Sequence, residues 1–364
     1  KFTQWLTKIN FRSIQGDTFA KFALGTGMWF IQGPKFEKWE ASADKQTLWV
    51  TGMPGSGKTI LTSIAVNHLE LKRASTTDVA VLYVYCRYSD YYTTTDILCT
   101  FVRQLLEEHG NLVAPIKAFC MDHQQKGTRP SKSGLLVLLK KLLITFTKVY
   151  ASIDALDELP DETKYDVLET LCSLPPNTSI LLTSRPLNAI RYLIPHAEHV
   201  SMESGTGKDI DTFIMSKLGQ SPRLRSLLKG NTRLIQEVCE QIKDKSQGMF
   251  LVVALHIDSL QRTTTLKSLR KALESLPSGV EANYRLSWER ISSQSEEEAS
   301  QARRAITWLT YADRSLTIAE LTHALAVSEE DGEFDEEAVL DSDLLISICC
   351  GLLAVEEQSG LVRL

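Results

Sequence analysis

The stretch VTGMPGSGKT at residues 50–59 constrains the fold of this 364-residue chain more than any other segment. Residues 52–59 match the pattern G-x-x-x-x-G-K-[S/T] at every position. An apolar triplet precedes the pattern and an apolar helical sequence follows it, which predicts a strand, a loop and a helix in that order. A glycine-rich loop in this setting surrounds phosphate with backbone N–H groups, so we expect a P-loop.

The loop residues have expected roles. Glycine permits the tight curvature that points backbone N–H groups inward, and the helix N-terminus favours negative charge. The Lys58 ammonium is expected to neutralise the β- and γ-phosphates, and the Thr59 hydroxyl to bind Mg²⁺. The predicted nucleotide-binding residues are Gly52, Met53, Pro54, Gly55, Ser56, Gly57, Lys58, Thr59 and Ile60.

Acidic residues follow a second predicted strand, in the sequence VYASIDALDE at 149–158. A P-loop needs a carboxylate at a neighbouring strand end to orient Mg²⁺, and Asp154 is the first acid after this strand, acting directly or through water. Either Glu158 or Asp157 is then expected to polarise an attacking water. The alternative is that these acids only favour the dipole of the next helix.

A third strand, ILLTSRP at 180–186, ends in polar residues and a cation. Thr183 or Ser184 is expected to reach the water or the γ-phosphate. Arg185 is expected to sense the γ-phosphate through a charge-assisted hydrogen bond. The alternative for Arg185 is a solvated side chain before a proline.

Alternating strands and helices between about residues 46 and 200 predict an α/β fold with a parallel sheet flanked by helices. After residue 200 the strand signal stops and helical patterns follow. Near the end, a helix, a T-x-x-E capping box at Thr317, another helix and two short strands suggest a winged helix. The predicted domains are a linker or base-side segment, a nucleotide-binding domain, a small helical domain and a truncated winged-helix domain, at 1–45, 46–200, 201–295 and 296–364.

Two short sequences imitate nucleotide motifs. The GTGK at 205–208 lacks the first glycine and the final hydroxyl of a P-loop, and we expect a turn that caps a helix. The TKYD at 163–166 resembles a guanine-reading motif but falls within a predicted helix, so it does not favour GTP.

The net charge of -5 and the pI near 5.9 give no reason to expect nucleic-acid binding. The acidic segment 328–337 argues further against a DNA-binding winged helix. No apolar run approaches the roughly 20 residues needed to span a membrane, and the seven scattered cysteines fit a cytoplasmic protein. The histidines form no zinc-binding pattern, so no zinc is expected.

The chain resembles fungal NACHT-domain proteins, which belong to the STAND class of signalling NTPases and are related to animal NOD-like receptors. The resemblance covers nearly the whole chain and rests on motifs that occur in the same order in that family. The most specific is D-A-L-D-E at 154–158. The motifs are GTGMWFIQGPKFEKW (25–39), TLWVTGMPGSGKT, SIDALDELP, ILLTSRP, DIDTFI (209–214), SQGMFLVVALHIDSL (246–260) and LTIAELTHALAV (316–327).

The resemblance implies a domain set that closes around ADP at rest, exchanges ADP for ATP, opens and self-associates. In family terms, Lys58 and Thr59 are the Walker A pair, Asp154 is the Walker B residue, Asp157 and Glu158 are the acidic pair, and Arg185 is the sensor arginine. Gly25, Thr26, Gly27 and Met249 are implied base-side contacts. The GMFL at 248–251 stands where related ATPases have a G-x-P-L turn, but it lacks the proline.

The family also implies an effector, a repeat sensor domain and a winged-helix histidine that binds the β-phosphate, all expected outside this sequence. Two functions remain open. The first is a slow nucleotide-gated switch in fungal innate immunity or heterokaryon incompatibility, with Mg²⁺ and ADP or ATP as its cofactors. The alternative is a continuously cycling ATPase that remodels a macromolecule, for which Glu158 would serve as general base.

Overall fold

The computed structural model describes residues 2–7, 9–74, 76, 78–87, 90, 92–328, 332–356 and 358–364. Contacts divide the chain into two compact units. The first consists of Lys1–Phe22, Gly27–Met53 and Lys58–Gly205. The second consists of Ala23–Thr26, Pro54–Gly57 and Thr206–Leu364.

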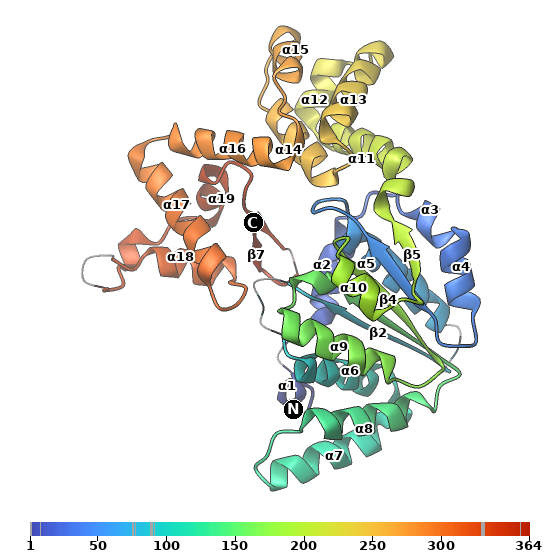
Figure 1. Cartoon of the computed structure of the whole chain (residues 1–364). Coiled ribbons are helices and arrows are strands. Elements are labelled where there is room, and N and C mark those ends of the chain that lie inside the picture. The colour runs from blue at the N-terminus through green and yellow to red at the C-terminus, as the bar shows by residue number, and fades with distance from the viewer. Residues whose placement is uncertain are drawn as a thin grey trace. The chain divides into compact units, whose positions relative to one another are not determined.

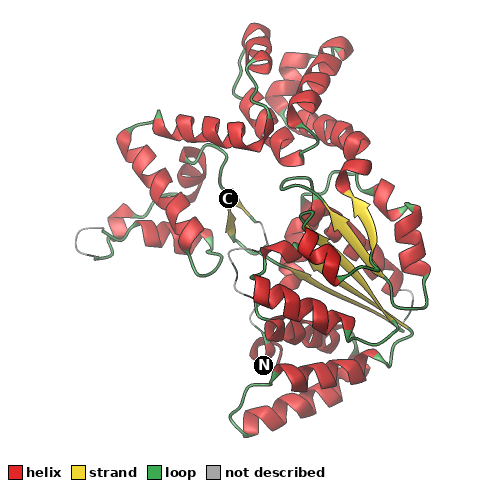
Figure 2. Cartoon of the chain, in the orientation of Figure 1, coloured by secondary structure: helices red, strands yellow, loops and turns green. Residues whose placement is uncertain are grey.

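The first unit is built on a five-stranded parallel sheet with the strand order β2-β3-β4-β1-β5, which confirms the predicted α/β class (Figure 2). All seven residues of β3 and of β4 are buried, as expected for central strands covered on both faces. Because β4 lies between β1 and β3, it separates the strand before the P-loop from the strand that ends at Asp154. The strands are β1 (Thr47–Thr51), β2 (Val79–Tyr85), β3 (Lys148–Asp154), β4 (Thr178–Ser184) and β5 (Glu198–Ser201).

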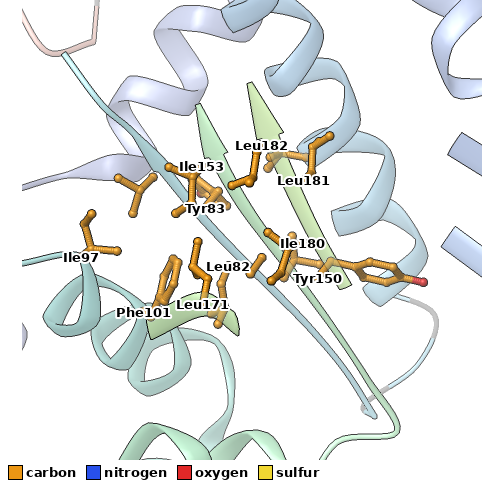
Figure 3. Packing of buried hydrophobic residues seen from close by; sticks show 14 of the residues in the cluster. Leu82, Tyr83, Ile97, Phe101, Tyr150, Ile153, Leu171, Ile180, Leu181 and Leu182 are labelled. Carbon is orange, nitrogen blue, oxygen red and sulfur yellow. The ribbon is translucent and has the colours of Figure 1, made fainter. Parts of the chain in front are cut away.

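Helices cover both faces of this sheet (Figure 1). Helix α5 (Lys58–Arg73) and helix α2 (Phe11–Ala20) lie on one face, while α6 (Thr94–Glu108) and α9 (Asp161–Cys172) lie on the other. Figure 3 shows Phe101 of α6 and Leu171 of α9 beside Leu82 of β2. The remaining helices between β2 and β5 are α7 (Val113–Gln125), α8 (Lys132–Leu143) and α10 (Asn188–Leu193).

The segment before β1, predicted to be a linker or a base-side segment, is largely helical. It forms α1 (Phe2–Leu6), α2, α3 (Met28–Ile31) and α4 (Pro34–Ala41). Phe36 and Trp39 of α4 are almost fully buried, and the Trp39 Nε1 donates to the Ile180 carbonyl oxygen of β4 at 3.0 Å. Their three-residue spacing puts both rings on one side of a helix, so this segment completes the hydrophobic core of the sheet.

Strand β5 is also absent from the sequence prediction. It has four residues, of which only Val200 is buried, so neither an apolar run nor a clear alternation marks it. The strand is recognised by its parallel pairing with β1, in which Trp49 lies opposite His199 and Val50 opposite Val200.

In the second unit, the described elements between residues 206 and 276 are all helices, as the helical patterns in the sequence predict. They are α11 (Thr206–Gln220), α12 (Pro222–Leu228), α13 (Thr232–Ser246), α14 (Phe250–Leu260) and α15 (Leu266–Glu274). One hydrophobic cluster joins them and extends from Ile210 to Leu276. Helix α12 was not predicted from the sequence. Its N-cap Ser221 and the Pro222 in its first turn are nevertheless helix-start signals.

The last part of the second unit has the order of a winged helix. Helices α17 (Glu296–Tyr311), α18 (Ile318–Leu325) and α19 (Ser342–Ile348) precede a hairpin of β6 (Ala354–Val355) and β7 (Val362–Arg363). Thr317 forms the expected capping box with Glu320 and pairs with Leu361 beside the hairpin. A separate hydrophobic cluster runs from Ile291 to Val362, and it includes the last turn of α16 (Gly279–Ser292).

None of the helices within the described ranges combines the length and the apolar character that a membrane span requires.

Candidate nucleotide-binding site

The predicted P-loop joins β1 to α5. Its first residue is fixed to the neighbouring strand, because the Gly52 N–H donates to the Ser184 carbonyl oxygen at 3.2 Å. Gly55 and Gly57 have φ angles of +76° and +91°, in the left-handed region that glycine adopts without steric cost. The two glycines therefore provide the curvature that a phosphate-binding loop needs.

Gly55 belongs to the second unit and contacts the helical part of that unit. The Leu251 N–H in the first turn of α14 donates to the Gly55 carbonyl oxygen at 3.2 Å. A Cβ atom added to Gly55 would lie 2.7 Å from the Leu251 Cβ, which leaves no space for a side chain. Leu251 belongs to the GMFL sequence, so this segment contacts the phosphate loop without the proline of related ATPases.

Two side chains of the loop match a phosphate ligand. The Ser56 hydroxyl is buried and has no hydrogen-bond partner among the residues that the structure describes. The Lys58 Nζ donates to the Gly52 and Met53 carbonyl oxygens, at 2.8 and 3.1 Å. Burial lowers the pKa of Lys58 below its ordinary value, although the nearby Asp157 and Asp154 charges act in the opposite direction. A hydroxyl without a partner and a partly desolvated ammonium both suit phosphate oxygens.

Asp154 is the most buried acid of the site, with 1% of its surface exposed. Its Oδ1 accepts hydrogen bonds from the Thr62 hydroxyl at 2.9 Å and the Thr183 hydroxyl at 2.6 Å. Burial raises the pKa of Asp154, and hydrogen bonds from Thr183, Thr59 and Thr62 oppose this effect. The structure therefore brings Asp154 together with Thr59, the two predicted metal ligands. This donor set fits Mg²⁺, which usually takes one or two protein oxygens in addition to phosphates and waters.

Asp157 is paired with Arg185. The Asp157 Oδ2 lies 3.0 Å from the Arg185 Nε, and its Oδ1 accepts the Arg185 backbone N–H at 3.1 Å. The Asp157 side chain is 6% exposed, whereas the Arg185 side chain is 56% exposed. Both carboxylate oxygens of Asp157 thus hold the residue that was predicted to sense the γ-phosphate.

A left-handed residue sets the directions of the acids after β3. Ala155 has a φ of +52°, and the chain then forms a short 3-10 helix from Leu156 to Glu158. This conformation is uncommon for a residue other than glycine. The turn sends Asp154 toward α5 and Asp157 toward Arg185, and Glu158 is close enough for its charge to raise the pKa of Lys58.

Thr183 and Ser184, of which one or the other was predicted to reach the water or the γ-phosphate, both form internal hydrogen bonds. Thr183 donates to Asp154 and accepts the Ala155 N–H at 2.8 Å. Ser184 accepts the Trp49 Nε1–H at 2.8 Å and donates to the Arg185 carbonyl oxygen at 2.7 Å. The reason is that both side chains are buried among strand ends, where a polar group must be satisfied internally.

The predicted base-side residues lie at turns. Gly27 has a φ of +74°, and a Cβ atom there would lie 2.6 Å from the Ile64 Cδ1 of α5. A Cβ atom added to Gly25 would lie 3.8 Å from the Thr212 Cγ2 of α11, and the Thr26 hydroxyl donates to the Ala23 carbonyl oxygen at 2.8 Å. Met249 is the N-cap of α14, and Ile60 packs against the core of the sheet. A base contact by Gly25, Thr26, Gly27 and Met249, and nucleotide binding by Ile60, stay predictions.

Sequence reasoning missed Thr62 and Leu251 as members of this site. Thr62 lies three residues after Thr59, so both fall on the same side of α5. The two hydroxyl residues Thr62 and Ser63, which interrupt the apolar run ILTSIAV, were the available signal. For Leu251 only the place of GMFL in the resemblance pointed to the loop.

Comparison with known proteins matches residues 25–185 to the family model described as Nephrocystin 3, N-terminal, which is less than half of the chain. The chain is also similar to vegetative incompatibility protein HET-E-1 of Podospora anserina, with 23% identity over 353 residues. This match covers 91% of the chain but only 25% of HET-E-1, so the chain spans about a quarter of that relative.

Several solved structures resemble the chain at low identity. Cdc6p from Pyrobaculum aerophilum has 13% identity and a TM-score of 0.45, with 95% of this chain and 92% of that chain covered. The ORC2 protein of Aeropyrum pernix, in ADPNP-ADP complexes, has 13% identity and a TM-score of 0.40, with 96% and 89% covered.

Proposed function

We propose that this chain is the nucleotide-binding part of a NACHT-domain switch of the STAND class. In this proposal it binds ADP in a resting state, exchanges it for ATP with Mg²⁺, and hydrolyses ATP slowly. One observation carries the proposal. A fully buried carboxylate at the end of β3, Asp154, is hydrogen-bonded to the first two turns of the helix that begins with the P-loop lysine.

In this proposal the side chains of the site have separate roles in binding phosphate and metal. Lys58 leaves the Gly52 and Met53 carbonyl oxygens to bind phosphate, and the Ser56 hydroxyl donates to a phosphate oxygen. Thr59 and Asp154 are the residues that would hold Mg²⁺. When bound, the metal neutralises negative charge on the phosphates.

Of the two acids left open by the sequence, Glu158 is the better general base. Its charge acts on Lys58 in the phosphate loop, whereas both oxygens of Asp157 accept from Arg185. Asp157 is better suited to orient Arg185, whose planar group would then contact the γ-phosphate.

The link between Gly55 and Leu251 favours a switch over a continuously cycling ATPase. A change in the phosphate loop at Gly55 would act directly on the first turn of α14. The similarity to a vegetative incompatibility protein agrees with a signalling role, since it covers nearly the whole chain. An effector, a repeat sensor and self-association on activation belong to the same proposal, as does a cytoplasmic location.

The test is to purify the protein without added nucleotide, denature it and identify the released nucleotide by chromatography. The switch hypothesis predicts nearly one ADP per chain. Protein that is folded, empty and unable to bind added ADP or ATP would refute the proposal. Protein that starts empty but turns ATP over rapidly would favour the cycling ATPase.

A further inference from the structure

Two of the threonine hydroxyls that hydrogen-bond Asp154, those of Thr62 and Thr183, donate to the same carboxylate oxygen. Thr62 donates from α5 and Thr183 donates from β4, and each reaches Oδ1. A carboxylate oxygen has two lone-pair positions, so two donors occupy Oδ1 fully. The other oxygen, Oδ2, is then the one that remains for the hydroxyl of Thr59, which also hydrogen-bonds this carboxylate, and for a metal or a metal-bound water.

The direction of the Thr183 hydroxyl proton is fixed by its neighbour. The Ala155 N–H donates to the Thr183 Oγ1 at 2.8 Å, so this oxygen serves as an acceptor toward the backbone. Its single proton must then point elsewhere, and Asp154 Oδ1 at 2.6 Å is the acceptor. The left-handed Ala155, which directs this N–H, thereby contributes to holding the carboxylate.

Thr62 has a choice of acceptors. Its hydroxyl lies 3.1 Å from the Lys58 carbonyl oxygen, four residues earlier in α5, and 2.9 Å from the Asp154 Oδ1. One proton cannot serve both at full strength, and an ionised carboxylate is the stronger acceptor. Thr62 therefore ties the helix that carries Lys58 and Thr59 to the strand that carries Asp154.

We propose that Thr62 and Thr183 are positioning residues that clamp Asp154 by one oxygen and present the other to Mg²⁺. This inference rests on the proposed nucleotide binding and deepens it. Neither threonine belongs to the G-x-x-x-x-G-K-[S/T] pattern or follows from it. Their effect is on metal affinity, and the phosphate contacts of the loop do not depend on them.

The test compares Thr62→Val and Thr183→Val with the wild type. Valine keeps the shape of threonine and removes the donor. ADP binding is measured by calorimetry twice, in EDTA and across a Mg²⁺ titration. We expect the ADP affinity in EDTA to stay unchanged. The Mg²⁺ concentration that gives half of the metal-dependent change in ADP affinity should rise on the order of tenfold. Thr62→Ser and Thr183→Ser keep the hydroxyl and should restore the wild-type Mg²⁺ dependence.

Two matched controls separate this effect from the loss of a buried hydroxyl in general. Thr178 lies on β4 with Thr183, is fully buried, and its hydroxyl has no hydrogen-bond partner within the described part of the chain. Thr170 on α9 is a buried helical counterpart with a hydroxyl in the same situation, and it serves as the control for Thr62. Thr178→Val and Thr170→Val should leave the Mg²⁺ dependence unchanged.

The outcomes distinguish two failures. If the wild type binds ADP and responds to Mg²⁺ but both valine variants keep its Mg²⁺ dependence, the positioning role is overturned while nucleotide binding stands. The positioning role would also be overturned if the valine variants lost as much ADP affinity in EDTA as they lose in the presence of Mg²⁺. If the wild type binds no nucleotide, the proposed function itself fails. If a valine variant does not fold, the corresponding serine variant is compared with Thr178→Ser or Thr170→Ser instead. A shift in the Mg²⁺ dependence of ADP binding that is larger for Thr62→Ser or Thr183→Ser than for these controls would overturn the proposal.

Discussion

The Leu251 amide nitrogen lies 3.2 Å from the Gly55 carbonyl oxygen, so the first turn of α14 is hydrogen-bonded to the candidate phosphate loop. The N–H groups in a first helical turn lack partners within the helix, and a loop carbonyl satisfies this one. The same contact places the Leu251 Cβ where a side chain on Gly55 would have to be. Gly55 is therefore constrained both by its backbone angle and by α14.

We predict that Gly55→Ala destabilises the protein by more than a left-handed backbone alone explains. The φ of +76° costs an alanine about 1–2 kcal/mol. The Cβ contact at 2.7 Å from the Leu251 Cβ adds about 1–3 kcal/mol, because a β-carbon cannot move away without its backbone. Urea unfolding of the ligand-free protein measures the sum.

Gly248→Ala is the matched control for this prediction. Gly248 has a similar φ of +80°, but nothing lies within 4 Å of the Cβ position. Its substitution should cost only the backbone contribution. Equal losses of stability for the two variants would show that α14 does not press on the loop.

A second prediction concerns Lys58→Arg. The loop accommodates a single compact ammonium between the Gly52 and Met53 carbonyl oxygens, and a planar guanidinium is too wide for that position. Purified variant should carry little or no ADP, whereas the wild type should carry ADP and turn ATP over well below about 10 per second. Released nucleotide and phosphate production measure both quantities. Retention of wild-type ADP by the variant would contradict the proposed cradle.

The sequence was sufficient to predict the parallel sheet, the P-loop and the meeting of Asp154 with Thr59. These depend on local signals: a motif at one strand end and an acid at another, in a sheet whose strands all point the same way. The carboxyl ends of parallel strands share one edge, so the acid and the loop had to be near each other.

The clamp on Asp154 could not be predicted in this way. It depends on β4 lying between β3 and β1, and on the register that pairs Ile153 with Leu182 and so brings Thr183 beside Asp154. Register and strand order come from packing over the whole unit, and no short sequence encodes them. The same holds for Trp39, whose burial against β4 makes a core element of what reads as a linker.

A third prediction separates the roles of the two acids after Asp154. Glu158→Gln should lower ATP turnover on the order of 10²–10⁴-fold while nucleotide binding is retained, as expected when a general base is removed. Asp157→Asn keeps the shape and one acceptor oxygen for Arg185, so its effect on turnover should be smaller. Single-turnover phosphate release after preloading with ATP measures the two. A larger loss for Asp157→Asn than for Glu158→Gln would reverse the assignment.

The last prediction concerns the pH dependence of stability and uses Asp154→Asn. Burial raises the pKa of Asp154 in the folded chain. A raised folded pKa means that the protonated carboxyl favours folding, and that this contribution is lost as the pH rises through the folded pKa. Above the folded pKa the ionised Asp154 therefore costs the ligand-free protein stability, and the neutral asparagine should increase the free energy of unfolding there. The gain should shrink as the pH falls toward 3.8, where an ordinary aspartate is half protonated.

Asp161→Asn is the control of opposite sign, since the Lys164 hydrogen bond lowers the pKa of that exposed carboxyl and no gain is expected there. Urea unfolding in EDTA at several pH values measures both variants, and a gain for Asp154→Asn that stays constant down to acid pH would rule out a charge effect.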